Sequence, residues 1–142
     1  MAVSSYLSDV AGGMVVGASF PTEAAADAGL ALLASSGVRP QDISVVARDA
    51  GLAERLAGDR AWTPERNAKG LARLLPGRMP SELKRRYAAA LRTGHVVVVV
   101  AADGQPPDTL AALLAQAKGT TIEQWWQTPA ALFAPPELAG PF

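Results

Sequence analysis

Few residues in this chain of 142 could carry catalytic chemistry. His95 is the single histidine, and the sequence contains no cysteine. Acid–base or nucleophilic catalysis by a histidine needs a partnered serine or carboxylate, and no such pattern surrounds His95. Disulfides, thiolate metal sites and cysteine nucleophiles are excluded because cysteine is absent. We therefore expect His95 to be a polar residue at a strand end, and the protein not to be an enzyme.

Glycines near the N-terminal strand do not form a nucleotide-binding motif. A dinucleotide fingerprint needs Gly-x-Gly-x-x-Gly between a strand and the helix that follows it. The strand predicted over residues 14–19 is followed by Phe20, Pro21 and Thr22, with no glycine among them. The sequence accordingly predicts neither a cofactor nor a metal.

Basic residues are concentrated in the middle of the chain. Residues 48–92 contain eleven Lys or Arg against five Asp or Glu, although the net charge of the whole chain is zero. Arginine offers planar donors that suit phosphate or carboxylate, so an anionic metabolite is one possible ligand. A solvated helix face is the other interpretation, and the zero net charge disfavours nucleic acid. The candidate anion-binding residues are Arg66, Lys69, Arg73, Lys84 and Arg85.

The C-terminal region is rich in aromatic residues and proline. Tryptophan is enriched where interfaces concentrate their binding energy, and a proline-containing segment stays extended and can lie across a neighbour. Such a segment could equally fold back and cover its own sheet. The candidate partner-binding residues are Trp125, Trp126, Phe133 and Phe142.

Two apolar runs must form the framework that positions these residues. Residues 96–100 are five consecutive valines, which favour a strand over a helix. An apolar run without alternation needs apolar cover on both sides. A second run covers residues 14–18, so the sequence predicts two central strands packed between other elements. Residues 42–48 and 120–126 are predicted as edge strands.

Helix signals lie between these strands. Thr22 is predicted to cap a helix whose buried face contains Ala25, Ala28 and Leu32 and is widened by Ala24, Gly29 and Leu33. Ser81 is predicted to cap a later helix that buries Leu83, Tyr87 and Leu91. The remaining predicted helices are a short one over residues 52–57, one that begins at Pro64, and one over residues 109–118 capped by Asp108 or Thr109.

The order of elements predicts the fold class. Two β-α-β units placed side by side give a ferredoxin-like α/β fold, an α+β sandwich, whose first and third strands are central. Here a basic helical insertion, residues 49–94, separates strands two and three; a parallel flavodoxin-like sheet is the alternative. We expect a leader over residues 1–13, one domain over residues 14–126 and a tail over residues 127–142. If the helices cover one sheet face, the insertion, the tail or a second copy must cover the other.

Two blocks of the sequence resemble a known family. Residues 15–20, 22–25 and 42–46, and then Tyr87 with residues 91–94 ahead of the valine strand, resemble the bacterial general stress protein (heat-induced stress protein) domain. The resemblance spans roughly residues 14–118 and implies the fold and a link to stress physiology. It implies no catalytic residues.

These patterns together predict a non-enzymatic protein-interaction module. It would act as a homo-oligomer, through the uncovered sheet face or the docked tail, or as an accessory subunit of a larger assembly. The alternative is a regulatory domain that binds an anionic metabolite or nucleotide through the basic insertion. No apolar run is long enough to span a membrane and no signal peptide is evident, so we expect a cytoplasmic protein.

Overall fold

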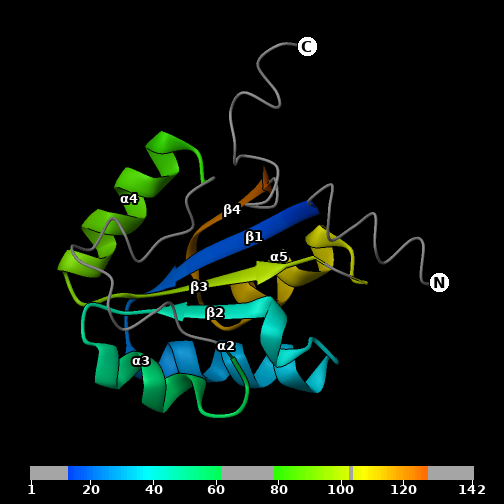
Figure 1. Cartoon of the computed structure of the whole chain (residues 1–142), viewed down its shortest axis with the longest axis horizontal. Helices are drawn as coiled ribbons and strands as arrows, with labels where there is room; N and C mark the ends of the chain where they lie inside the picture. The colour runs from blue at the N-terminus through cyan, green and yellow to red at the C-terminus, as the bar shows by residue number, and fades with distance from the viewer. Residues whose placement is uncertain (1–12, 62–78, 103, 128–142) are drawn as a thin grey trace, which may run out of the picture.

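We describe the protein from a computed structural model, which describes residues 13–61, 79–102 and 104–127. The helix predicted to begin at Pro64 lies outside these residues, as do the predicted leader and tail except for Gly13 and Gln127, which belong to strands. The described residues form four strands and four α-helices around one sheet (Figure 1).

The sheet is antiparallel throughout, in the order β2-β3-β1-β4. Its strands are β1 (Gly13–Phe20), β2 (Ile43–Val46), β3 (Val96–Ala101) and β4 (Thr120–Gln127). The predicted central pair, β1 and β3, and the predicted edge strands, β2 and β4, are confirmed. This order is the ferredoxin-like arrangement, so the fold is an α+β sandwich and the parallel flavodoxin-like alternative is wrong.

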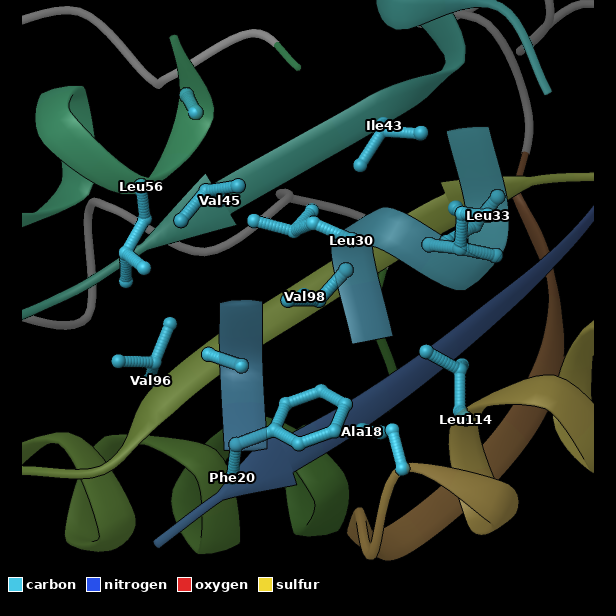
Figure 2. Close-up of a cluster of buried hydrophobic side chains, with 14 of the residues drawn as sticks. Ala18, Phe20, Leu30, Leu33, Ile43, Val45, Leu56, Val96, Val98 and Leu114 are labelled. Atoms are coloured by element: carbon cyan, nitrogen blue, oxygen red, sulfur yellow. The ribbon is translucent and has the colours of Figure 1, made fainter. Parts of the chain in front are cut away.

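Three helices cover one face of the sheet. They are α2 (Glu23–Ser35), α3 (Ala50–Ala57) and α5 (Pro107–Gln116), and a short 3₁₀ turn (Pro40–Asp42) leads from α2 to β2. Figure 2 shows Val96 and Val98 of β3 together with Leu30 and Leu33 of α2 in this core. Alternate residues of β1 and β3 supply the sheet side of this cluster, because side chains alternate between the faces of a strand.

The opposite face is covered by the insertion between β2 and β3. Helix α4 (Ser81–Arg92) lies there, on the side of the sheet away from α2 and α3 (Figure 1). Leu83, Tyr87 and Leu91 are buried against Val97 and Val99, as predicted. Of the three covers predicted for this face, the insertion is the one observed, so self-association through an uncovered sheet face has no support.

The starts of two helices differ from the sequence prediction. Thr22 caps α2 as predicted, and its hydroxyl accepts from the amide of Ala25 at 3.1 Å. Helix α4, however, is preceded by Pro80, so Ser81 is its first helical residue rather than its cap. Helix α5 begins two residues earlier than predicted, at Pro107, because proline fits the first helical turn.

The buried face of α2 is also rotated from the predicted one. Ala26, Gly29, Leu30 and Leu33 are buried, whereas Ala28 is exposed and Ala25 and Leu32 are half-buried. The reason is the ring of Phe20: a β-carbon at position 29 would lie 2.8 Å from its Cζ atom. Only glycine lets the helix approach the ring this closely, so Gly29 must face the sheet.

The two-sided burial of β3 gives the first prediction. Val98→Ala and Val99→Ala should each lower the free energy of unfolding by about 2 kcal/mol, because one valine faces each core. Urea unfolding of both variants beside the wild type measures this. A strand with one wet face would leave one of the two variants within about 0.5 kcal/mol of the wild type, and that result would contradict the packing described.

Candidate functional site

The two adjacent tryptophans of β4 lie on opposite faces of the sheet. Trp125 is 5% exposed and packs with Tyr87 beneath α4. Trp126 is 57% exposed, the one large hydrophobic side chain among the described residues that solvent reaches to this extent. Of the four predicted partner-binding residues, Phe133 and Phe142 lie outside the described chain. Of the two that are described, Trp125 belongs to the core and Trp126 offers an accessible aromatic surface.

The backbone of β4 faces two ways. The amide of Ala102 donates to the carbonyl oxygen of Met14 at 2.9 Å, so the backbone groups of Met14 point toward β3. Met14 lies opposite Trp126 on the other side of β1. In an antiparallel ladder, hydrogen-bonded and non-hydrogen-bonded pairs alternate. Met14 and Trp126 therefore form a non-hydrogen-bonded pair, and the N–H and C=O groups of Trp126 point away from the sheet.

The same alternation orients the neighbours of Trp126. Gln124, two residues earlier, also presents its N–H and C=O outward, whereas Glu123 and Trp125 direct theirs to β1. Since the peptide bonds are trans, the inward amide of Glu123 leaves the carbonyl of Ile122 pointing outward. We call this surface the β4 edge: the outward backbone groups of residues 122–126 and the ring of Trp126.

A bulge interrupts β4 just before this edge. Ser19 pairs with Thr120 and Gly17 with Glu123, so β4 carries one residue more than β1 over this interval. Thr121 in the bulge has φ of +50°, a backbone conformation that is strained for a β-branched residue. Its carbonyl leaves the ladder and accepts from the hydroxyl of Tyr87 at 2.6 Å. The bulge is thus held by a side chain of the inserted helix.

Glycine at position 17 makes this arrangement possible. A β-carbon there would lie 2.8 Å from the Tyr87 hydroxyl oxygen and 3.0 Å from two ring carbons of Trp125. Tyr87 and Trp125 therefore occupy the space over β1 that a larger residue would fill. No sequence pattern predicted this close contact at Gly17, although a glycine inside a strand often marks a close approach.

Charged and polar side chains near the β4 edge are largely paired within the chain. Arg86 of α4 lies 3.7 Å from the carboxylate of Glu123. The side-chain amide of Gln124 donates to the carboxylate of Asp108 on α5 at 2.8 Å. These contacts give the Glu123 carboxylate a cationic partner on one side of the strand and the Asp108 carboxylate a neutral hydrogen-bond donor on the other.

Of the five predicted anion-binding residues, the described structure includes the neighbours Lys84, which is half-buried, and Arg85, which is exposed, both on α4. Arg66, Lys69 and Arg73 lie outside the described residues. Arg85 is on the outer side of α4 and forms an ion pair with Glu82 at 3.1 Å, where both side chains are about three-quarters exposed. Such an exposed pair contributes little to stability.

The sequence did not predict a polar cluster at one end of the sheet. The Ser19 hydroxyl oxygen lies 2.9 Å from the Thr120 hydroxyl oxygen and 3.4 Å from Nδ1 of His95. Thr120 also donates to the Ser19 carbonyl at 3.1 Å. If each proton is used once, Ser19 donates to Thr120 and accepts from Nδ1–H of His95. His95 then stabilises a buried hydroxyl at a strand end, and Ser19, which is 2% exposed, is closed to solvent.

Comparisons with known proteins do not assign the chain to a family. No family model, curated protein or solved structure matches the chain. Among the described residues, no group of three His, Cys, Asp or Glu side chains could hold a metal ion. That part of the chain also contains no helix with the length and apolar character to cross a membrane.

The close approach at Gly17 gives a prediction about packing. Gly17→Ala should lower the free energy of unfolding by about 1–3 kcal/mol, because the new methyl group overpacks the contact with Tyr87 and Trp125. Gly13→Ala is the matched control in the same strand, since no atom lies within 4 Å of a β-carbon there. Equal unfolding midpoints for the two variants would contradict the contact.

The buried hydroxyl of Tyr87 gives a prediction about pH. Burial, reinforced by the Glu123 carboxylate, raises the pKa of Tyr87 above its ordinary value of 10.0. The folded state holds this proton more tightly, so the contribution to stability is complete below the unfolded pKa. It is lost as the pH rises above about 10.

Tyr87→Phe removes this titration. Its free energy of unfolding should fall less steeply with pH than that of the wild type, between about pH 9 and about pH 11. Near neutral pH the variant should be about 1 kcal/mol less stable, because the hydrogen bond to Thr121 is lost. Urea unfolding across the pH series measures both effects, and parallel pH profiles would show that Tyr87 titrates as an exposed tyrosine does.

Proposed function

We propose that this chain is a protein-interaction module that binds a partner through the β4 edge. The observation that carries the proposal is the exposed ring of Trp126 beside outward backbone groups on a strand of eight residues. An open edge of this length is a template for pairing with another chain. Addition of a strand supplies main-chain hydrogen bonds, and Trp126 supplies an apolar anchor.

The contrast between the two edges of the sheet supports this assignment. The other edge strand, β2, has only four residues and is followed, after Ala47, by Arg48 and Asp49. Short strands and flanking charges are common protections against edge pairing. On β4 the charged Glu123 is matched by Arg86, and no proline or lysine interrupts the strand. The β4 edge therefore lacks the protection that β2 has.

Two further expectations stay predictions. Binding of an anionic metabolite depends on Lys84 and Arg85 of α4 together with Arg66, Lys69 and Arg73, which lie outside the described residues. The resemblance to the bacterial general stress protein domain predicts a setting in stress physiology, in which a small module of this kind would serve a larger assembly.

A pair of variants at one position tests the proposed function. Gln124→Pro removes an N–H that faces outward, and proline is tolerated at such an edge position. Gln124→Ala is the matched control, because it also loses the bond to Asp108 but keeps the backbone N–H. Each full-length variant carries an affinity tag in cells that express the chain natively, and intact-mass measurement identifies the complexes that it forms.

We expect Gln124→Ala to retain the complexes of the wild type, whether with a further copy of the chain or with another protein. Gln124→Pro should lose them by tenfold or more, while its circular dichroism spectrum remains that of the control. If both variants retain the same complexes, or if the wild type forms none, the β4 edge is not a binding surface.

A further inference from the structure

We propose that the partner strand at the β4 edge is β4 of a second copy of this chain. A two-fold axis through Gln124 and perpendicular to the sheet would join two four-stranded sheets into one of eight strands. This inference rests on the proposed function, since it names the occupant of the same edge. Three features of the molecule support it: the hydrogen-bond directions of β4, the order of side chains along β4, and the position of α5.

The outward groups of β4 are self-complementary. Across an axis at Gln124, the N–H of each Gln124 faces the C=O of the Gln124 in the other copy, so the two residues exchange two hydrogen bonds. The outward N–H of Trp126 then meets the outward C=O of Ile122 in the second copy. With the symmetric counterparts, this register makes four main-chain hydrogen bonds and leaves none of the outward donors of Gln124 and Trp126 unpaired.

The side chains select this register over its neighbours. In antiparallel pairing, residues directly opposite each other point to the same face, so shifts of the axis by one residue can be compared. An axis at Glu123 places two Glu123 carboxylates directly opposite, which is destabilising. An axis at Trp125 places the exposed Trp126 ring opposite the polar Gln124.

The axis at Gln124 instead places Trp126 opposite Ile122 of the second copy. Both side chains lie on the face that carries α5, because Gln124 between them bonds Asp108 and Ile122 packs against the core on that face. An aromatic residue opposite a β-branched one is a favourable cross-strand pair. The pairing would cover the large hydrophobic side chain that the single chain leaves exposed.

The charges of β4 are compatible with this seam. On the other face of the strand, Glu123 lies opposite Trp125 of the second copy rather than opposite its own counterpart. Each Glu123 keeps its pairing with Arg86 at 3.7 Å. The Glu123–Arg86 pair therefore adds no net charge to the seam, whereas each copy also brings the carboxylate of Asp108, whose hydrogen-bond donor is the neutral side-chain amide of Gln124 at 2.8 Å.

The position of α5 also fits a second copy. Helix α5 packs over β1 and β4, on the side of the seam. With strands about 4.8 Å apart, two helices centred over β1 and β4 of each copy would lie about 10 Å from each other, the distance at which helices pack. Asp108, which bonds Gln124, marks the side of α5 nearest the seam. Ala111 and Ala115 share that stripe at spacings of three and four, and such small residues allow close approach.

The C-terminal segment is a less suitable occupant of the β4 edge. Residues 128–142 contain four prolines, each of which lacks the N–H that a paired strand must donate. A second β4 has no proline and supplies every donor of the four bonds. The observations therefore favour a second copy over pairing within one chain.

Light scattering on the purified full-length chain is the first test. Across a concentration series, the wild type and Gln124→Ala should reach twice the 14.7 kDa mass of one chain. Gln124→Pro should keep the mass of one chain at every concentration. A wild type that remains monomeric throughout would overturn the inference.

Single cysteines test the register. Because the chain has no cysteine, Gln124→Cys introduces the only thiol. The proposed axis would place the two thiols on residues about 5.5 Å apart at Cα, within the range of a disulfide. Under mild oxidation, Gln124→Cys should form a cross-linked dimer several-fold faster than the matched exposed control Glu123→Cys. Equal rates, or faster cross-linking of the control, would overturn the proposed register.

The outcomes separate this inference from the proposed function. A monomeric purified chain that still captures another protein, in a manner sensitive to Gln124→Pro, would overturn the second copy as partner and support the function. If Gln124→Pro loses binding in neither the capture assay nor light scattering, both the inference and the proposed function are contradicted, since the β4 edge would then carry no interaction. A doubled mass with the predicted cross-link would support both.

Discussion

The burial of β3 on both faces is the constraint on which the rest of the structure depends. Because five successive residues of β3 are valines, both faces of the strand are apolar, and each face needs a helical layer to exclude water. Helices α2 and α5, the two helices of a simple ferredoxin-like domain, supply one layer together with α3 of the insertion. The second layer is α4, which the chain inserts between β2 and β3. The long insertion therefore supplies the helix that buries the second face of the sheet.

The second layer also shapes the edge of the sheet. Tyr87 of α4 reaches past Gly17 to the carbonyl of Thr121 and holds the bulge of β4 in a strained conformation. Trp125 packs beside Tyr87 in the same cluster, which leaves Trp126 on the other face. One buried hydroxyl thus links the inserted helix to the strand that carries the proposed binding surface. The strain at Thr121 is maintained by the surrounding contacts, as is common near functional sites.

The two edge strands of the sheet differ in length and in the charges near them. At β2 the strand is short, and two charged residues, Arg48 and Asp49, follow it after Ala47. At β4 the strand has eight residues, and its charge is balanced by α4 rather than directed against a neighbouring chain. An exposed tryptophan at such an edge is costly to leave in water, and its burial against another strand would recover that free energy. This asymmetry is the physical basis for assigning interaction to one edge.

The sequence by itself determined the framework: the unalternating valines required central, two-sided burial, and Leu83, Tyr87 and Leu91 at spacings of four marked the buried face of α4. For α2 it placed Gly29 and Leu33 only at the margin of the buried face and missed Ala26 and Leu30, because the fit of Gly29 over the ring of Phe20 is a contact between distant elements. It likewise could not separate Trp125 from Trp126 or place Ser19 beside His95. Periodicity reports which residues share a face, whereas register, bulges and close approaches depend on atoms far apart in the chain. Only the tertiary structure brings those atoms together.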